Sequence, residues 1–479
     1  MTPLTLPEIA DVVGGTVVHD SGATVTGAAF VDSRVAERGG LFVAAVGEHV
    51  DGHDYADAAL AGGAVAVLST RDTGQPGVLV DDPVAALAVL ARHSLARLTG
   101  VRVVALTGSQ GKTSTKDLLA QVLAVAGRTV ATFGSFNNEL GLPLTVLRAD
   151  SSTEYLVLEM GARHVGDLRA SCAITPPDVS VVLNVGKAHI GEFGSQAGIA
   201  QAKGEVVEAL GENGVAVLNA DDPLVAAMAG RTKAQVRTFG SAPTADVRFG
   251  DLDLDDLGRP SFTLHSGEDT AQVSMGLVGE HHALNAAAVA AVALALGISL
   301  AEVAGALGSA AATSRSRMEV TERADGVTVI DDAYNSNPDS VRAALKALAA
   351  IGRGRPGART VAVLGEMREL GESTTDEHDA VGRLAVRLDI HQLLVVGEAA
   401  RPIHLGASLE GSWGNESVFV ADNDAATAWL REHLVPGDVV LFKASNAARL
   451  SQVASAVLAD VSDVSDVPAG DAAHEATGR

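Results

Sequence analysis

Short apolar runs alternate with amphipathic segments along most of the chain, and this alternation predicts an α/β protein. In the central part, the apolar runs fall at residues 129–132, 155–159, 179–185 and 214–219. Helical patterns separate these runs, for example at 200–210, so we expect a mostly parallel sheet. Apolar and polar residues then alternate at 248–278, which predicts antiparallel strands added to that sheet.

The two ends of the chain show different patterns. The first hundred residues are turn-rich, with predicted strands at 16–18, 28–31 and 41–46 and a helix at 84–98. Strands and helices alternate regularly from 327 to 443, as in a doubly wound, Rossmann-like domain. We therefore expect a small α/β domain at 1–100, a central P-loop domain at 101–314, a Rossmann-like domain at 315–460 and a disordered tail at 461–479.

Composition narrows the functional classes. The 479 residues contain 35 Lys and Arg and 59 Asp and Glu, so the net charge of −24 argues against nucleic-acid binding and docking on anionic membranes. Cys172 is the only cysteine, which excludes an intramolecular disulfide. There is no basic amino-terminal region before a long apolar stretch, and no apolar run suited to spanning a bilayer. We expect a cytoplasmic protein.

The segment 103–116, VVALTGSQGKTSTK, places two glycines and a lysine between a predicted strand and a predicted helix. Gly108 and Gly111 permit a tight turn whose N–H groups face an anion at a helix N-terminus. Lys112 is placed to reach phosphate oxygens, and the Thr113 hydroxyl to bind Mg²⁺. The spacing is shorter than the common G-x-x-x-x-G-K-[ST], and the alternative is a turn with a solvated lysine. The strand-loop-helix context favours phosphate binding.

Two chemically capable residues follow neighbouring apolar runs. Glu159 ends YLVLE, and His189 follows VSVVLNV. Because the carboxyl ends of parallel strands meet at one edge of a sheet, we expect both near the phosphate loop, where a carboxylate suits magnesium. The alternatives are a solvent-facing acid and a structural histidine. Lys203 lies in a predicted helix, and its surroundings in sequence alone assign it no function.

Polar clusters elsewhere are candidates for substrate binding. Asp32, Ser33 and Arg34 follow a strand, and Arg34 is a candidate phosphate partner, although a hydrophilic loop is equally consistent. FNNELGLP at 136–143 carries amides that either bind a substrate or cap a helix. DDAYNSNP at 331–338 carries more polar groups than a turn needs, which predicts a nucleotide or second-substrate site.

The chain resembles the Mur ligases of peptidoglycan synthesis, whose relatives include folylpolyglutamate synthases. The resemblance rests on ordered motifs: TGSQGKTS, FNNELGLP, LEMGA, NVGKAHIGEFGS, IAQAKGE, GEHHALNAAA, RME and DDAYNSNPDS. Within the family, DDAYNSNPDS, VAVLGEMRELGE and the amino-terminal DSR and GEHVDGHD are most similar to the branch that adds D-alanyl-D-alanine. Two departures are His282, where the family has an asparagine, and the stretch Ala444, Ser445, Asn446, which differs from the family's K-G-S-R.

The resemblance implies roles for individual residues. It implies two Mg²⁺ ions held by Thr113, Glu159, His189 and Lys203, with Lys203 carbamylated. The implied catalytic residues are Lys112, His189, Lys203 and Arg317. The implied ATP contacts are Gly108, Ser109, Gln110, Gly111, Lys112, Thr113, Ser114, Asn285, Arg317 and Asp332. The expected substrate contacts are Asp32, Ser33, Arg34, Asn138, Tyr334, Asn335 and Asn337, the first three for the UDP group bound by the amino-terminal domain.

The resemblance also implies the reaction and its partners. ATP would phosphorylate the terminal carboxylate of UDP-N-acetylmuramoyl-tripeptide, and the amine of D-alanyl-D-alanine would attack the acyl phosphate, giving an amide, ADP and phosphate. We expect a monomer that binds neither nucleic acid nor membrane. One alternative is another amide ligase of this fold, such as one that adds glutamate to a folate. The other is a nucleotide-binding regulatory module without ligase activity.

Overall fold

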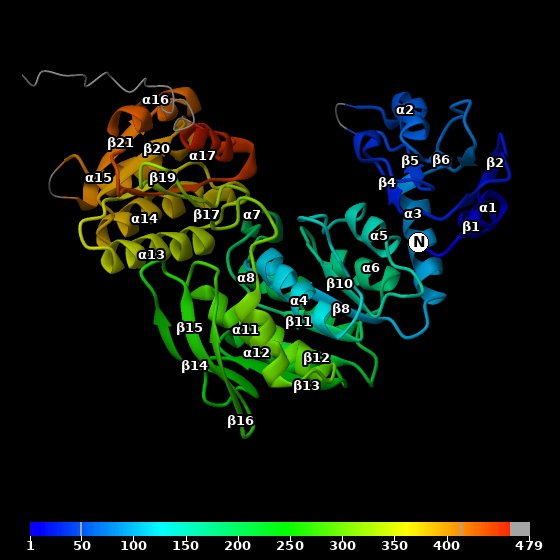
Figure 1. Ribbon diagram of the computed structural model, residues 1–479, viewed down its shortest axis with the longest axis horizontal. Helices are drawn as coiled ribbons and strands as arrows, with labels where there is room; N and C mark the ends of the chain where they lie inside the picture. The colour runs from blue at the N-terminus through cyan, green and yellow to red at the C-terminus, as the bar shows by residue number, and fades with distance from the viewer. Residues whose placement is uncertain (48–49, 412–413, 460–479) are drawn as a thin grey trace, which may run out of the picture. The chain divides into compact units, whose positions relative to one another are not determined.

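The computed structural model describes residues 1–47, 50–411 and 414–459, and the tail predicted at 461–479 lies outside them. The predicted α/β class is confirmed. The chain divides into two compact units (Figure 1). Unit 1 comprises residues 1–255, 259–314 and 369–371, and unit 2 comprises 256–258, 315–368 and the described residues from 372 onward. The finer predicted domain boundaries stay predictions.

Unit 1 begins with a five-stranded sheet in the order β2-β7-β6-β5-β4, parallel except for β2. The last helix of this part begins at Pro83 because Asp82 accepts hydrogen bonds from the N–H groups of Val84 and Ala85. The strand predicted at 41–46 ends at Val43. The elements are β1 Leu4–Thr5, α1 Leu6–Val13, β2 Thr16–Val18, β3 Thr24–Val25, β4 Ala29–Phe30, β5 Leu41–Val43, α2 Ala56–Ala61, β6 Ala66–Ser69, β7 Gly77–Leu79 and α3 Pro83–Ala96.

The rest of unit 1 is built on a nine-stranded sheet in the order β16-β15-β14-β13-β12-β11-β8-β10-β9. The strands from β9 to β14 pair in parallel, and β14, β15 and β16 form the expected antiparallel end (Figure 1). The strands are β8 Arg102–Thr107, β9 Thr129–Ala131, β10 Tyr155–Glu159, β11 Val179–Val182, β12 Val215–Asn219, β13 Gln235–Gly240, β14 Val247–Leu254, β15 Pro260–Ser266 and β16 Asp269–Ser274. The helices are α4 Lys112–Ala126, α5 Gly141–Val146, α6 Asp167–Ile174, α7 Ile190–Phe193, α8 Gln196–Lys203, α9 Glu205–Glu208, α10 Pro223–Ala226, α11 His281–Ala295 and α12 Leu300–Ser309.

The single helix predicted at 200–210 was wrong, because α8 and α9 are separate helices that meet at Gly204. The guanidinium of Arg231 occupies the space where a Cβ at Gly204 would lie. Arg231 donates hydrogen bonds from Nη1 to the carbonyl of Ala200 and from Nη2 to that of Gln201, at 3.0 and 2.9 Å. A distant side chain thus accompanies the break between the two helices, which local periodicity could not indicate.

Unit 2 contains a six-stranded sheet in the order β17-β18-β22-β19-β20-β21, parallel except for β17. Its first long helix begins after Asn337, whose side chain accepts a 2.9 Å hydrogen bond from the N–H of Ser340. The elements are β17 Glu319–Glu322, β18 Thr328–Asp331, α13 Pro338–Gly354, β19 Thr360–Leu364, α14 Thr374–Arg387, β20 Gln392–Val396, α15 Arg401–Glu410, β21 Ser417–Val420, α16 Asn423–His433, β22 Val439–Lys443 and α17 Leu450–Ala459. None of the described helices has the length and apolarity needed to cross a bilayer.

Candidate active site

The predicted phosphate loop connects β8, which ends at Thr107, to α4, which begins at Lys112. Gly111 has a φ of +77°, and a Cβ there would lie 3.0 Å from Asn285 Oδ1. A Cβ at Gly108 would lie 2.9 Å from the Cβ of Leu183. Both glycines are therefore required, one by its left-handed backbone and both by the closeness of their neighbours.

The side chain of Asn184 holds the loop in shape. Its Oδ1 accepts hydrogen bonds from the N–H groups of Ser109 and Gln110 at 2.9 and 3.0 Å, and its Nδ2 donates to the carbonyl of Gln110 at 3.2 Å. The Ser109 hydroxyl in turn accepts a 2.9 Å hydrogen bond from the N–H of Gly186. Sequence reasoning missed Asn184, although it directly follows the apolar run VSVVL of the strand beside β8.

Lys112 and Thr113 occupy the first turn of α4, as predicted for a phosphate and metal site. Lys112 Nζ donates a 2.8 Å hydrogen bond to the carbonyl of Gly108, so its ammonium group lies over the loop. Thr113 is buried, and its Oγ1 lies 3.3 Å from Ser135 Oγ. A helix N-terminus with a lysine ammonium group beside it favours a phosphate anion.

Glu159 is a buried carboxylate at the end of β10, the strand next to β8. Its Oε1 accepts a 2.7 Å hydrogen bond from Asn137 Nδ2, and its backbone N–H donates to Thr132 Oγ1 at 3.0 Å. Its Oε2 is buried and has no hydrogen-bond partner among the described residues. Because an unpaired buried carboxylate oxygen is costly, Oε2 is a candidate ligand for a cation.

His189 and Lys203 share the electrostatic environment of Lys112. Burial lowers the pKa of His189, the Glu369 carboxylate opposes this shift, and the ammonium group of Lys112 lowers the pKa further, as would any positive charge on Lys203. Burial also lowers the pKa of Lys203 well below its ordinary value, and the charge of Lys112 adds to that effect. No carboxylate among the described residues offsets it. The uncharged amine is thereby favoured at Lys203.

The amino-terminal turn of α11 adds two buried polar side chains. Asn285 packs against Gly111 through Oδ1, and its Nδ2 has no hydrogen-bond partner in the described part of the chain. The ring of His282 lies 4.4 Å from that of His281, centroid to centroid. Burial lowers the pKa of His282 well below its ordinary value, and His281 lowers it further. Asn285 therefore lies beside the loop, as an ATP contact requires.

The predicted substrate residues of unit 1 have local partners. Arg34 Nη2 lies 2.6 Å from Asp32 Oδ2 and is largely exposed, and the hydrogen bonds from Arg34 lower the pKa of Asp32 to about 2. Ser33 lies in a single turn of 3-10 helix, Ser33–Val35, after β4. Asn138 Oδ1 accepts a 3.0 Å hydrogen bond from the N–H of Gly141 at the start of α5. Asn138 thus accepts a hydrogen bond from the first N–H of α5, although the residue at the N-cap position is Leu140, and the substrate roles stay predictions.

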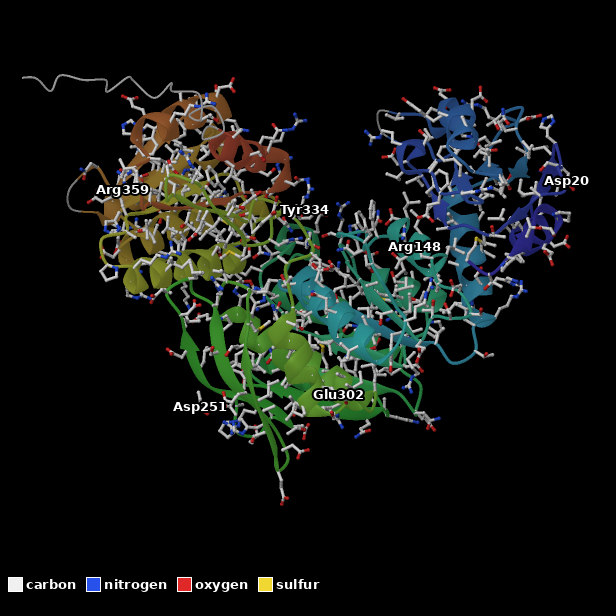
Figure 2. All side chains as sticks on the ribbon, in the orientation of Figure 1. Asp20, Arg148, Asp251, Glu302, Tyr334 and Arg359 are labelled. Atoms are coloured by element: carbon white, nitrogen blue, oxygen red, sulfur yellow. The ribbon has the colours of Figure 1, made fainter. Side chains whose placement is uncertain are left out.

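In unit 2, the predicted residues gather where β18 and β22 end. Lys443 is buried, and its Nζ lies 2.6 Å from Asp332 Oδ2 and 3.0 Å from the carbonyl of Asn335. The Arg317 guanidinium lies 4.3 Å from the ring centroid of Tyr334, which Figure 2 labels. Arg317, Asp332, Tyr334 and Asn335 are thus brought together, whereas the Asn337 side chain caps α13.

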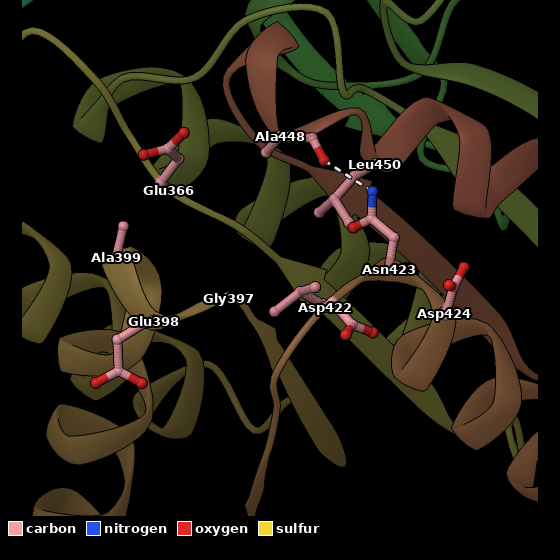
Figure 3. Close-up of a pocket in the computed structure, with 10 residues that line it drawn as sticks. Glu366, Gly397, Glu398, Ala399, Asp422, Asn423, Asp424, Ala448 and Leu450 are labelled. Atoms are coloured by element: carbon pink, nitrogen blue, oxygen red, sulfur yellow. Dashed lines mark hydrogen bonds between the residues drawn. The ribbon is translucent and has the colours of Figure 1, made fainter.

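A cavity of about 440 Å³ opens in unit 2 at the carboxyl ends of β20 and β21 (Figure 3). Its charged lining is acidic: Glu366, Glu398, Asp422 and Asp424. Three of these carboxylates have local partners. Glu366 pairs with Arg368 at 2.6 Å, Glu398 with Arg401 at 3.0 Å, and Asp422 accepts from the N–H of Ala425 at 2.9 Å. These three carboxylates therefore stabilise the segments around them. None of the predicted site residues lines the cavity.

The donor set of unit 1 fits magnesium in its chemistry. Within the described ranges, no group of three or more histidine, cysteine, aspartate or glutamate side chains is placed to hold a metal ion. The buried Oε2 of Glu159 and the hydroxyl of Thr113 are nevertheless hard oxygen donors, which Mg²⁺ prefers. Carbamylation of Lys203 would add another oxygen donor.

Known proteins match this chain over most of its length. Residues 31–95 match the catalytic domain of the Mur ligase family, 106–293 the Mur ligase middle domain, and 316–446 the Mur ligase glutamate ligase domain. The UDP-N-acetylmuramoyl-tripeptide--D-alanyl-D-alanine ligase of Mycobacterium tuberculosis is 51% identical, over 96% of this chain and 98% of its own. The ligase of that name from Bacillus subtilis is 33% identical, over 95% and 98%.

Solved structures agree with this match. MurF from Acinetobacter baumannii superposes with a TM-score of 0.83 at 30% identity and covers 96% of this chain and 99% of its own. The MurF ligase from Thermotoga maritima, solved in complex with ADP, gives a TM-score of 0.77 at 32% identity, over 92% and 99%. From the matched domains and the full-length relatives, we conclude that this chain belongs to the Mur ligase family.

Proposed function

We propose that this chain is the ATP-dependent ligase that joins D-alanyl-D-alanine to UDP-N-acetylmuramoyl-tripeptide in peptidoglycan precursor synthesis. The observation that carries the proposal is the phosphate loop held by Asn184, with the buried Glu159 and Lys203 and the half-buried His189 in the same unit. Full-length relatives with this activity in their names, at 51% and 33% identity, support the choice of substrates. We also propose a cytoplasmic monomer.

The reaction proceeds in two steps, formation of an acyl phosphate and then formation of the amide. A carboxylate oxygen of the tripeptide forms a bond to the γ-phosphorus of ATP, and the bond to the β-γ bridging oxygen breaks, releasing ADP. The amine of D-alanyl-D-alanine then attacks the acyl carbon, phosphate leaves, and the amine gives up a proton. The loop N–H groups and the Lys112 ammonium group bind the phosphates and offset charge on the transferred group.

Magnesium would be held by Thr113, Glu159, His189 and a carbamate on Lys203, and would neutralise phosphate charge when bound. The carbamate forms when the uncharged Nζ of Lys203 attacks the carbon of CO₂, which makes a C–N bond and releases one proton. Burial of Lys203 and the neighbouring charge of Lys112 favour the uncharged amine that this step needs.

The remaining site residues bind the substrates in this proposal. Asp32, Ser33 and Arg34 contact the UDP group, and Asn138 contacts the muramoyl-peptide. Asn285, Arg317 and Asp332 contact ATP. Tyr334, Asn335 and Asn337 contribute to substrate binding from unit 2.

The test is a substrate-pair screen for phosphate release from ATP. Phosphate release should require UDP-N-acetylmuramoyl-tripeptide and D-alanyl-D-alanine together, and mass spectrometry should detect the amide product. Equal turnover with a folate and glutamate would instead indicate the related amide ligase. ATP binding without any amide product would indicate a regulatory module.

A further inference from the structure

The loop between β9 and α5 touches both side chains whose oxygens are proposed to bind magnesium. Ser135 Oγ lies 3.3 Å from Thr113 Oγ1, and Asn137 Nδ2 donates a 2.7 Å hydrogen bond to Glu159 Oε1. The rings of Phe133 and Phe136 on the same loop are exposed and stack with centroids 6.2 Å apart. The side chains of Ser135 and Asn137 therefore contact the site residues, whereas the aromatic rings of the loop are exposed.

Asn137 is fixed to the segment after β10 by its backbone as well as by its side chain. The N–H of Gly161 donates a 2.9 Å hydrogen bond to the carbonyl of Asn137. A Cβ at Gly161 would lie 2.8 Å from Asn137 Oδ1, so the amide has room only because residue 161 is glycine. Asn137 is thus held in a defined position relative to Glu159.

The choice of an amide matters for the charge of Glu159. A neutral amide satisfies one carboxylate oxygen without forming an ion pair, whereas an arginine or lysine would compensate the negative charge. The other oxygen, Oε2, is buried and has no hydrogen-bond partner among the described residues. The contact orients the carboxylate and leaves its charge for a cation.

We propose that Asn137 is a positioning residue, whose amide holds the Glu159 carboxylate with Oε2 presented to Mg²⁺. This inference rests on the proposed function, in which Glu159 is a magnesium ligand. Side chains that orient a metal ligand typically contribute 10- to 100-fold to metal affinity. Asn137 acts through Glu159 and makes no bond to the reacting atoms.

The test measures metal binding directly in the full chain. In Asn137→Ala, we expect the affinity for Mn²⁺ in the presence of ADP, measured by electron paramagnetic resonance, to fall about 10- to 100-fold. The Mg²⁺ concentration for half-maximal phosphate release should rise by the same factor, with kcat at saturating Mg²⁺ changed much less. ADP affinity in EDTA and the melting temperature without metal report on folding and should stay near those of the unmodified chain.

Asn423→Ala is the matched control, because Asn423 Nδ2 donates a 3.0 Å hydrogen bond to the carbonyl of Ala448 in unit 2. It should leave Mn²⁺ affinity unchanged. Since Asn137 is proposed to act through Glu159, adding Asn137→Ala to Glu159→Gln should cause little further loss. Fully additive losses, or a normal Mn²⁺ affinity in Asn137→Ala alone, overturn the inference. Unchanged Mn²⁺ affinity in Glu159→Gln overturns the metal assignment of the proposed function as well.

Discussion

Lys203 in unit 1 and Lys443 in unit 2 are both buried, and the two lysines have opposite surroundings. Lys203 in unit 1 has Lys112 as its electrostatic neighbour and no compensating carboxylate among the described residues. Lys443 in unit 2 lies 2.6 Å from Asp332 and also donates to the carbonyl of Asn335. Burial lowers the pKa of both, but Asp332 opposes the shift at Lys443.

This difference distinguishes a lysine that is held in a buried ion pair from a lysine whose surroundings favour the reactive, uncharged amine. A buried ammonium group paired with a carboxylate is satisfied where it is, and removing either partner is costly. A buried amine beside another cation is destabilised in its charged form and is a nucleophile when uncharged. Lysine content or helix position could not have distinguished these two environments.

The largest expected effect is the loss of activity on replacing Lys203, the buried lysine without a carboxylate partner among the described residues. Lys203→Ala should lower phosphate release on the order of 100-fold or more, because it removes a ligand of the Mg²⁺ that is proposed to offset phosphate charge. Added short-chain carboxylates should restore part of the activity. The protein exposed to ¹³C-labelled bicarbonate should show a carbamate signal by NMR that Lys203→Ala lacks. Lys233→Ala, at an exposed position, is the control. Full activity in Lys203→Ala would remove the carbamate from the account.

The ion pair between Lys443 and Asp332 predicts a loss of stability when Lys443 is replaced. Lys443→Met should lower the free energy of unfolding by about 3–5 kcal/mol, because it leaves the Asp332 carboxylate without its buried partner. Urea denaturation measures the change, and the double variant Lys443→Met with Asp332→Asn should recover part of it. If the single variant is as stable as the original chain, the pair is not the structural contact described here.

A matched glycine pair tests whether phosphate binding belongs to unit 1. Gly111→Ala should weaken ADP binding about tenfold, because φ is +77° and Asn285 Oδ1 lies 3.0 Å from the added Cβ. Gly326→Ala in unit 2 also has a positive φ, +88°, but its nearest neighbour is 3.7 Å away. Gly326→Ala should therefore strain the backbone without weakening ADP binding. Calorimetric titration measures the ADP affinity of the two variants, and an equal loss of affinity in both would contradict the assignment of phosphate binding to unit 1.

The smallest effect concerns the buried thiol. Burial raises the pKa of Cys172 to about 12, so the thiol stays protonated at pH 8. Iodoacetamide should label it slowly in the folded protein and fully in urea. Above pH 9 the unfolded state loses a proton that the folded state keeps, so the contribution of this thiol to stability should fall as pH rises. Cys172→Ala should keep activity within about twofold, and a larger loss would indicate a role for Cys172 in the site.

Much of the architecture could be predicted from local pattern. The strands Thr16–Val18 and Tyr155–Glu159 have the predicted bounds, because each is a short run rich in apolar and β-branched residues. The helix Leu6–Val13 was not predicted, although Thr5 and Glu8 form a capping box at its start. The family resemblance supplied the role that is proposed for Lys203, which its own surroundings in sequence did not indicate.

The parts that could not be predicted depend on residues far apart in the chain. Asn184 reaches the phosphate loop across about 75 positions, and Asn137 reaches Glu159 across 22. Nothing near either asparagine in sequence names its partner, since that contact exists only after the parallel strands have paired. Strand order alone could place both residues at the correct edge of the sheet, but it could not specify the hydrogen bonds.

The Asn184 hydrogen bonds have a consequence for the thermodynamics of nucleotide binding. Ordering the backbone of a free loop costs about 1–2 kcal/mol per residue. Here the N–H groups of Ser109 and Gln110 are held by the side-chain amide of Asn184, a group of the protein itself. Their entropy is lost when the sheet folds, so nucleotide binding does not have to order them. We expect the conformational part of the entropy of ADP binding to become more unfavourable in Asn184→Ala, which calorimetry at several temperatures can measure.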